Sequence, residues 1–391
     1  MNDEPVYLDH AASTPMYAEA AAAMTRQLAR IGNPSSLHAS GRAARRVVEE
    51  SREKIAQALN ARPGEVVFTS GGTESDNLAL KGLFWARRAA DPRRTRILST
   101  AVEHHAVLDP LHWLGTDEGA DVELIAVDRL GRLDVDAFRA AVERDPGSVA
   151  LASVMWANNE VGTVQPLPAV VEIAHEHGIP VHSDAVQAVG QLDVDFAASD
   201  VDALTVTGHK VGGPYGVGAL VVRRELELTA LLHGGGQERD IRSGTIDAPA
   251  IAGFAEAVEL SVKLRPELAP RIAGLRDDLV RRVREVVPDA IYNGDPVDRL
   301  PGNAHLMFPG CEGDSLLMLL DARGIECSTG SACSAGVPQP SHVLLAMGCS
   351  EEYARSSLRF SLGHTSTQAD VDALAGAIGP VVERARAAKR P

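Results

Sequence analysis

The sequence has few of the features that mark secreted, membrane or metal-cluster proteins. Only 4 of its 391 residues are cysteines and no two form a Cys-x-x-Cys pair, which argues against a disulfide framework and a zinc site. No apolar run approaches the roughly 18 residues that a membrane span needs. The start of the chain, Met1 to Pro5, lacks the basic and apolar regions of a signal peptide. We therefore expect a cytoplasmic protein with no direct membrane contact.

An excess of positive charge is also lacking. The 38 Lys and Arg residues against 53 Asp and Glu residues give a formal net charge of −15, which argues against general nucleic-acid binding. The apolar and charged fractions, 45% and 23%, are those of an ordinary globular protein. A chain of 391 residues is long enough for two domains, or for one large domain with a satellite.

The middle of the chain alternates between short apolar segments and amphipathic helical segments. Over about 150 residues this alternation predicts βαβ units and a mostly parallel sheet. The expected strands are 66–70, 96–99, 122–127, 149–155, 180–183 and 203–207. The expected helices are 17–30, 41–59, 133–143, 167–177 and one that ends near residue 90. The segment 248–286 is also helical in pattern, but because it contains Pro266 and Pro270 we expect two helices there.

A mixed pattern follows in the last third of the chain. Strands are expected at 304–308, 325–328 and 357–362, and helices at 313–323 and from about residue 367. The sequence therefore predicts an α/β protein that consists of a large domain with a mostly parallel sheet and a smaller α+β domain.

A lysine at the end of a predicted strand is the first candidate for chemistry. Lys210 closes the turn Thr207-Gly208-His209-Lys210 after the strand 203–207. A partly desolvated lysine amine is nucleophilic and is the usual choice for a Schiff base. The alternative is an ordinary exposed lysine at a strand end, so other motifs must decide.

A glycine turn between a strand and a helix is the second candidate. In Ser70-Gly71-Gly72-Thr73-Glu74-Ser75, free N–H groups at the helix start could cradle a phosphate. Gly72 would let the phosphate approach and Thr73 would offer a hydroxyl. The alternative is a plain helix start capped by Thr73.

Further polar residues follow other predicted strands. Asp184 could hold a proton on a ring nitrogen or could cap a helix, and Gln187 could reach a ring substituent. His104 could stack on a flat ring or move protons, and could equally be a structural histidine, whereas an asparagine such as Asn159 usually marks a turn. All of them follow the carboxyl ends of strands, the edge at which α/β sheets bind ligands. Together with Lys210 they are the parts that a pyridoxal phosphate enzyme needs.

Two residues of the last third complete the candidates. Cys333 lies at the centre of a small, polar segment, 327–336, where a thiol would be exposed enough to react. Cys327 is expected to pack in a strand, and Cys311 and Cys349 to be buried or partly buried. Arg359 lies in an alternating strand and could clamp a carboxylate or pair with a surface acid.

The sequence resembles the cysteine desulfurases of the NifS/IscS type (group I), within the class V aminotransferase-like, fold-type I pyridoxal phosphate enzymes. The resemblance runs from Tyr7 to Gly363 and rests on Gly32–Ser36, Thr69–Asn77, Glu103-His104, Asn158–Glu160, Ser183–Ala185, Gly208–Lys210, Arg242–Thr245 and Gly330–Cys333. It implies a seven-stranded, mostly parallel sheet flanked by helices. It also implies an N-terminal arm (1–15) that joins the small domain, a large cofactor domain (16–260) and a small domain (261–391) carrying the catalytic cysteine loop (about 327–340).

The resemblance also implies roles for individual residues, with pyridoxal 5′-phosphate as the cofactor. The catalytic residues would be Cys333, Lys210 and His104. The cofactor would be bound by Gly72, Thr73, His104, Asn159, Asp184, Gln187, Thr207, His209, Lys210 and, from the other subunit of a homodimer, Thr245. The substrate carboxylate would be bound by Asn33, Asn159 and Arg359. No resident metal is expected, although Cys333 could be a transient cluster ligand.

The implied reaction converts L-cysteine to L-alanine and leaves the sulfur as a persulfide on Cys333. An acceptor protein would take the sulfur for iron–sulfur cluster assembly or tRNA thiolation. Three alternatives remain. Two are enzymes: a selenocysteine lyase, or another class V enzyme such as an aminotransferase or kynureninase. The third is a cofactor-less sulfur carrier. The sequence departs from the family's frequent residues at Thr207, His105 and Gln237. It also ends soon after its last predicted helix, whereas family members that dock a cluster scaffold often have a longer C-terminal tail, so transfer to such a scaffold in the usual way is left open.

Overall fold

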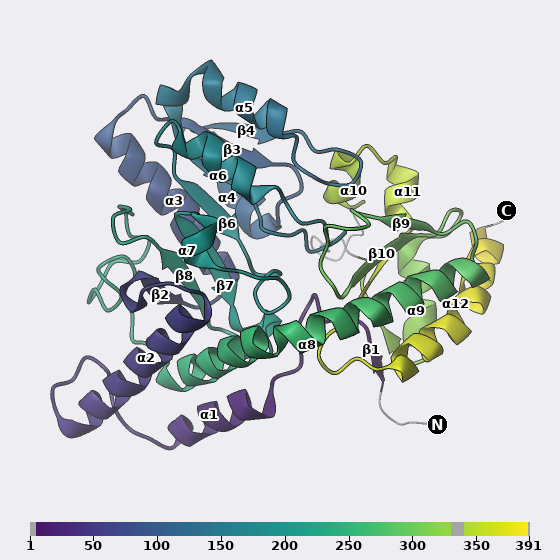
Figure 1. The fold of residues 1–391 in the computed structure, drawn as a ribbon, viewed down its shortest axis with the longest axis horizontal. Coiled ribbons are helices and arrows are strands. Elements are labelled where there is room, and N and C mark those ends of the chain that lie inside the picture. Colours follow the sequence, from purple (N-terminus) through teal and green to yellow (C-terminus); the bar gives the residue numbers. More distant parts are fainter. Residues whose placement is uncertain (1–4, 330–339, 390–391) are drawn as a thin grey trace.

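A seven-stranded sheet is the centre of the computed structural model, which describes residues 5–329 and 340–389 (Figure 1). Its strands, in spatial order, are β2 (Val66–Thr69), β8 (Gly218–Val222), β7 (Ala203–Thr207), β6 (Val181–Asp184), β5 (Val149–Ser153), β3 (Arg96–Thr100) and β4 (Asp121–Ile125). Only β8 runs antiparallel to its neighbours in this sheet. The predicted mostly parallel, seven-stranded sheet is therefore confirmed.

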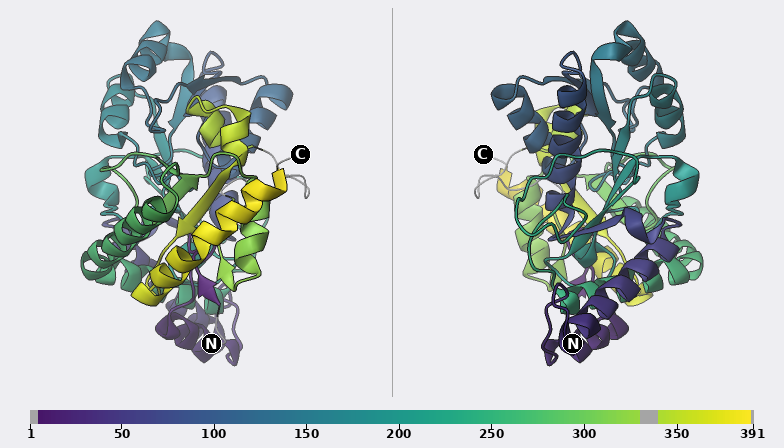
Figure 2. Two further views of the ribbon diagram at one scale, coloured as in Figure 1. Left: turned by 90° about the vertical axis from the view of Figure 1, so that its right-hand side faces the viewer. Right: turned by 90° about the vertical axis from the view of Figure 1, so that its left-hand side faces the viewer.

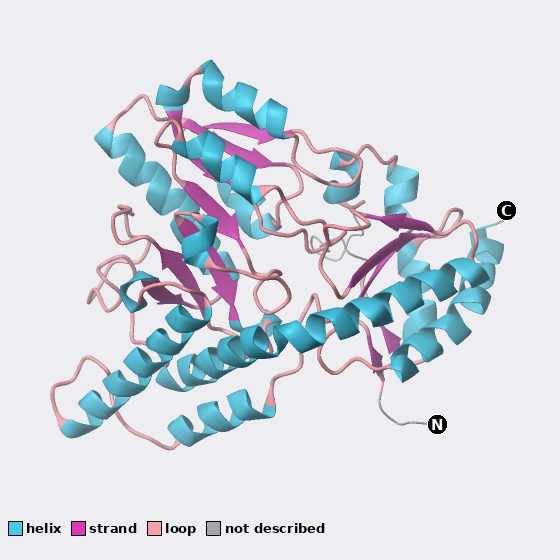
Figure 3. Ribbon diagram, in the orientation of Figure 1, coloured by secondary structure: helices cyan, strands magenta, loops and turns pink. Residues whose placement is uncertain are grey.

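Helices cover both faces of this sheet (Figure 3). They are α1 (Ala18–Leu28), α2 (Ala39–Ala58), α3 (Gly72–Ala90), α4 (His105–Asp117), α5 (Val135–Arg144), α6 (Leu167–His175) and α7 (Phe196–Ser199). On one face α3 and α4 pack on β3 and β5 through residues such as Phe84 and Leu111. Phe138 of α5 and Val170 of α6 belong to a second cluster of buried side chains. Because both faces are covered, every residue of the inner strands β3, β5, β6, β7 and β8 is buried, polar residues such as Ser99 and His182 included.

The segment 248–286 forms one continuous helix, α8 (Ala248–Val286), so the prediction of two helices was wrong. Pro266 and Pro270 lie inside it and are exposed. The carbonyls that these prolines leave without a helical partner can therefore bond to water. Packing holds the two ends, because Phe254 lies in the core of the large sheet and Leu279 in a separate core.

That separate core lies under a three-stranded antiparallel sheet of order β12 (Ser357–Ser361), β10 (Asn303–Met307) and β9 (Ile291–Asn293). The remaining helices are α9 (Gly313–Asp321), α10 (His342–Ala346), α11 (Glu351–Arg355) and α12 (Gln368–Lys389). Helix α12 packs along α8 (Figure 2). The expected boundary at residue 260 falls within α8, which contributes to both cores.

The N-terminal segment joins this smaller part of the molecule. Strand β1 (Val6–Tyr7) pairs with β11 (Ile325–Glu326) in parallel, and Asp9 forms an isolated bridge with Ser361 of β12. In residues 5–329 and 340–389, no helix combines the length and apolar character that crossing a membrane requires.

Candidate active site

A cavity of about 410 Å³ opens at the carboxyl ends of the parallel strands. This volume lies within the range of about 300–1,000 Å³ that is usual for small-molecule sites. Among the residues that line it are these candidates from the sequence: Gly72, Thr73, His104, Asn159, Asp184, Gln187, Thr207, His209, Lys210 and Arg359. Residues more than 280 positions apart in the chain, such as Gly72 and Arg359, thus meet at one place.

Three other candidates are not seen in this cavity. Asn33 is exposed between α1 and α2, where its side-chain oxygen accepts a hydrogen bond from the Ser35 N–H at 2.9 Å. Thr245 is exposed just before α8. Cys333 lies outside the described residues. Within one chain, the described residues that line the cavity do not include Asn33 or Thr245.

Lys210 ends a short 3-10 turn (Gly208–Lys210) that directly follows β7. Its Nζ donates hydrogen bonds to the carbonyl oxygens of Ala11 and Ala12, at 2.5 and 2.8 Å. Burial, and to a smaller extent the nearby Arg359 cation, lower the pKa of this amine from 10.5 to about 8. The fraction of amine that is unprotonated, and nucleophilic, near neutral pH is therefore much larger than for an ordinary lysine.

Asp184 is the last residue of β6 and is buried. Burial raises the pKa of its carboxyl to about 6, although the Val186 N–H, which donates to Oδ1 at 2.9 Å, and the Lys210 cation oppose the rise. The Asp184 carboxyl can therefore hold or share a proton with a ring nitrogen in the cavity.

Asp76 is a second buried carboxyl in the cavity wall, which the sequence analysis missed. Burial and the neighbouring Asp184 raise its pKa well above its usual range. Its Oδ1 has no hydrogen-bond partner among the described residues. The sequence did contain a signal for this residue: Asp76 lies one helical turn after Gly72 on α3, so the two residues face the same side of the helix.

The glycine turn before α3 forms a close-fitting cradle. Gly71, not Thr73, is the N-cap residue, with a φ of 150°, so the alternative of a Thr73 cap was wrong. A Cβ added at Gly72 would lie 3.0 Å from a methyl group of Val186. The first N–H groups of α3 lack helical partners and can bind an anion together with the hydroxyl of Thr73. This donor set fits a phosphate group.

His209 and Thr207 flank the cradle. The Nδ1 of His209 is hydrogen-bonded to Ser13 Oγ at 3.0 Å. Burial and the Lys210 cation lower the pKa of this imidazole to about 4, so the ring is neutral at physiological pH. A neutral ring can donate one N–H to an anion without adding a net charge.

His104 precedes α4 and caps it. Its Nδ1 accepts a hydrogen bond from the Ala106 N–H at 3.1 Å. Burial is the main cause that lowers its pKa to about 4. The ring is therefore neutral, and because Nδ1 is an acceptor its proton is on Nε2.

Arg359 projects from β12 and its side chain is only 6% exposed. Its Nη1 donates to the Asn159 carbonyl oxygen at 3.0 Å, and its Nη2 donates to Asp9 Oδ1 at 2.8 Å. Arg359 therefore lines the cavity and is also paired with a partly exposed acid, because the Asp9 side chain is 21% exposed. The planar guanidinium suits a carboxylate ligand.

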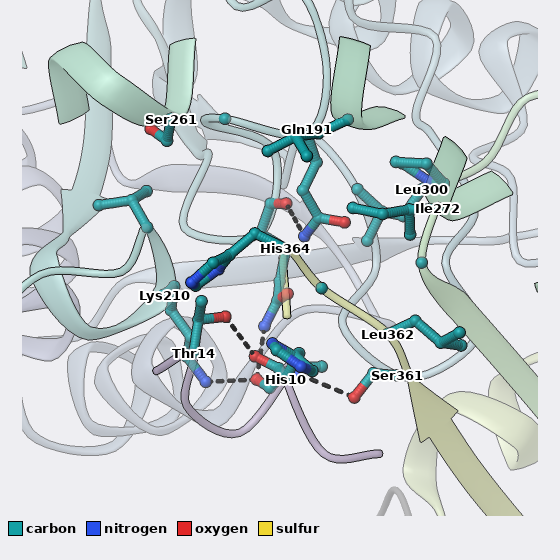
Figure 4. A pocket seen from close by; sticks show the side chains of 18 of the residues that line it. His10, Thr14, Gln191, Lys210, Ser261, Ile272, Leu300, Ser361, Leu362 and His364 are labelled. Carbon is teal, nitrogen blue, oxygen red and sulfur yellow. Dashed lines mark hydrogen bonds between the residues drawn. The ribbon is translucent and has the colours of Figure 1, made fainter. Parts of the chain in front are cut away.

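A second, small cavity of about 50 Å³ lies behind the first and shares Ala11, Gln187 and Lys210 with it. In Figure 4, Lys210 and Thr14 lie on the left of this cavity and Ile272 and Leu300 on its right. Its volume suits one or a few water molecules and not a cofactor. The larger cavity is therefore the candidate active site.

The three cysteines within the described residues do not reach this site as nucleophiles. Cys311 and Cys327 are buried, as expected, and Cys349 is partly buried. Burial raises the pKa of the Cys327 thiol to about 12, so it is not a thiolate at neutral pH. No group of three or more His, Cys, Asp or Glu side chains in the described residues could hold a metal ion.

Comparisons with known proteins agree with this geometry. The family model described as aminotransferase class-V matches residues 6–374. An IscS-like cysteine desulfurase of Mycobacterium tuberculosis is 57% identical, over 98% of this chain and 97% of the relative. The cysteine desulfurase IscS of Dictyoglomus turgidum is 42% identical, over 97% and 95%.

Solved structures show the same fold. A NifS-like protein matches with a TM-score of 0.89 at 33% identity, over 97% of this chain and 100% of that one. The structure described as SspA in complex with cysteine matches with a TM-score of 0.78 at 34% identity, over 91% and 98%. The chain therefore belongs to the class V aminotransferase family, among its IscS-like, pyridoxal phosphate-dependent cysteine desulfurases.

Proposed function

We propose that the protein converts L-cysteine to L-alanine and transfers the sulfur, as a persulfide on Cys333, to an acceptor protein. One observation carries the proposal: a single cavity gathers a desolvated amine, a buried carboxyl, an anion cradle and an arginine. A structural relative whose description names cysteine as its ligand supports the choice of substrate.

The residues of the cavity fit pyridoxal 5′-phosphate. In this proposal the cradle residues Gly72, Thr73, Thr207 and His209 bind the phosphate. His104 would contact the face of the cofactor ring, Asp184 its nitrogen and Gln187 its hydroxyl. Asn159 would be a further contact of the ring. When bound, the cofactor supplies an electron sink for the bonds to the substrate's α-carbon.

The chain's own side chains then bind the substrate and move its protons. Arg359 and Asn159 bind the α-carboxylate, assisted by Asn33. Lys210, as the free amine, takes the proton from Cα and returns a proton to the product. Asp184 is ionised above about pH 6 and keeps the ring nitrogen protonated. His104, with its proton on Nε2, takes part in proton transfer at the ring face.

Cys333 completes the reaction in this proposal. Its thiolate attacks the substrate Sγ, and the Cβ–Sγ bond breaks with its electron pair moving to the substrate carbon. That carbon takes a proton and becomes the methyl group of alanine. Cys333 is left with the extra sulfur, which an acceptor's thiol can then accept.

A homodimer is part of the proposal. The loop between α1 and α2 exposes Ile31 by 90% and Leu37 by 84%, and large exposed apolar side chains commonly mark interfaces. Thr245 of the partner subunit would complete the phosphate site. The chain would divide into an arm (1–15), a large domain (16–260) and a small domain (261–391). The enzyme would work in the cytoplasm and supply iron–sulfur cluster assembly or tRNA thiolation.

The test uses purified protein with pyridoxal phosphate and L-cysteine. Alanine and sulfide are measured together, and mass spectrometry locates the extra sulfur. Cys333→Ser should keep the yellow bound cofactor and lose sulfide release. The matched control Cys349→Ser should retain both. Sulfide release that persists in Cys333→Ser would exclude Cys333 as the nucleophile.

A further inference from the structure

The segment 9–14, which we call the arm segment, forms part of the wall between the two cavities. At one end it is fixed to β12, because the Ala11 N–H donates to Ser361 Oγ at 2.8 Å. At the other end the Thr14 N–H donates to the His209 carbonyl oxygen at 2.9 Å. The arm segment thus connects the strand that carries Arg359 with the turn that carries Lys210.

Asp9 begins the arm segment and forms an ion pair with Arg359. Its Oδ1 lies 2.8 Å from Arg359 Nη2, and the two side chains are 21% and 6% exposed. The Asn159 carbonyl oxygen holds Nη1 of the same guanidinium. Two acceptors therefore fix the plane and the rotation of this side chain.

Arg359 has donors that these two bonds do not use. Its Nε is buried and has no acceptor among the described residues. A guanidinium presents its donors in a fixed fork, so fixing two of them also fixes the direction of the rest. The unused N–H groups of the two terminal nitrogens are fixed with it, and a carboxylate ligand in the cavity that Arg359 lines would accept hydrogen bonds from them.

Asp9 also interacts with two cations that line the cavity, Arg359 and Lys210. The Asp9 carboxylate favours the protonated form of Lys210, whereas the Arg359 cation opposes it. Without Asp9, Arg359 would lose its only ion-pair partner among the described residues, and its repulsion of the Lys210 ammonium would no longer be offset by the Asp9 charge. Rotation of Arg359 away from Lys210 would relieve that repulsion and misplace its unused donors.

We propose that Asp9 is a positioning residue that holds Arg359 in the orientation in which it binds the α-carboxylate of the amino-acid substrate. This inference rests on the proposed function, because it takes the ligand of Arg359 to be the substrate carboxylate. A competing explanation is that Asp9 only anchors the arm segment to the smaller sheet.

The experiment compares Asp9→Asn with the unchanged holoenzyme. L-alanine, the product, is titrated against the absorbance of the bound cofactor to give a Kd, and KM and kcat are measured for L-cysteine. Loss of a charge-assisted hydrogen bond should raise the Kd and the KM about tenfold. Because the contact is present in both ground and transition states, kcat should change less than about twofold.

Tyr7→Phe is the matched control. The Tyr7 hydroxyl donates to the carbonyl oxygens of Asp9 and Ser13, at 3.1 and 2.7 Å. Its removal weakens the arm segment and leaves the Asp9 carboxylate in place. We expect a lower Tm and an unchanged Kd for L-alanine. If the Kd for L-alanine rises as much in Tyr7→Phe as in Asp9→Asn, Asp9 only anchors the arm segment.

A double-mutant cycle with Arg359→Lys gives an independent test. If Asp9 acts through the guanidinium, adding Asp9→Asn to Arg359→Lys should raise the Kd no further. Additive effects, or an unchanged Kd in Asp9→Asn alone, would overturn the proposal. If Asp9→Asn fails to fold, Asp9→Glu keeps the charge and should give an intermediate Kd, whereas an unchanged Kd would again overturn it. If the holoenzyme without any substitution shows no absorbance change with either L-alanine or L-cysteine, the proposed function itself is contradicted.

Discussion

The pH dependence of cofactor uptake is the sharpest prediction from the site. Only an unprotonated Lys210 can attack the cofactor's aldehyde. With a pKa of about 8, roughly 9% of the amine is free at pH 7, against about 0.03% for a lysine with the ordinary pKa of 10.5. Uptake by the apoprotein should therefore be about 300-fold faster at pH 7 than an ordinary lysine would allow.

The rate should rise with pH and level off near pH 9. The assay mixes apoprotein with pyridoxal phosphate between pH 6 and pH 10 and follows the absorbance of the attached cofactor. Borohydride reduction followed by peptide mass spectrometry confirms attachment at Lys210. Lys210→Ala is the control and should show no covalent attachment.

A variant tests the electrostatic cause. The Arg359 cation lowers the pKa of Lys210, so Arg359→Gln should move the midpoint of the profile to higher pH. The reasoning is refuted if the rate still rises tenfold per pH unit between pH 8 and pH 10. A midpoint that moves to lower pH in Arg359→Gln would refute the assigned cause.

Two further predictions concern stability and assembly. Glu238→Ala should destabilise the fold by about 3–5 kcal/mol in a denaturant titration, because Glu238 pairs with buried Arg52 and accepts the Phe68 N–H of edge strand β2. The exposed Glu225, changed to Ala, is its control, and equal stabilities would contradict the prediction. Sedimentation should show a dimer, and Thr245→Ala should weaken cofactor binding in that dimer; a fully active monomer would contradict both.

Local pattern predicts the elements of the large sheet well. Most of its strands contain short apolar or β-branched runs, amphipathic helices separate them, and both signals depend only on neighbouring residues. The same pattern places Asp184 and Lys210 at strand ends, because a strand's last residue is visible where apolar character stops. Parallel order then brings those ends to one edge.

Contacts between distant segments leave no such local signal. Asp9 and Arg359 are 350 positions apart, and nothing near either residue indicates the other. Asp76 was missed because a carboxylate in a helix is usually solvated, and only the fold shows that it is buried. The proline rule failed in α8 because both prolines lie on its exposed side and packing stabilises its two ends.

Helix α8 has a mechanical consequence. Since this single 39-residue helix contributes side chains to both cores, no flexible linker is available there to change the angle between the two sheets. Any such change must bend the helix itself. Bending needs least energy around Pro266 and Pro270, where the hydrogen-bond ladder is already interrupted. The two prolines thus mark the place at which α8 would bend in any movement of the smaller sheet relative to the larger one.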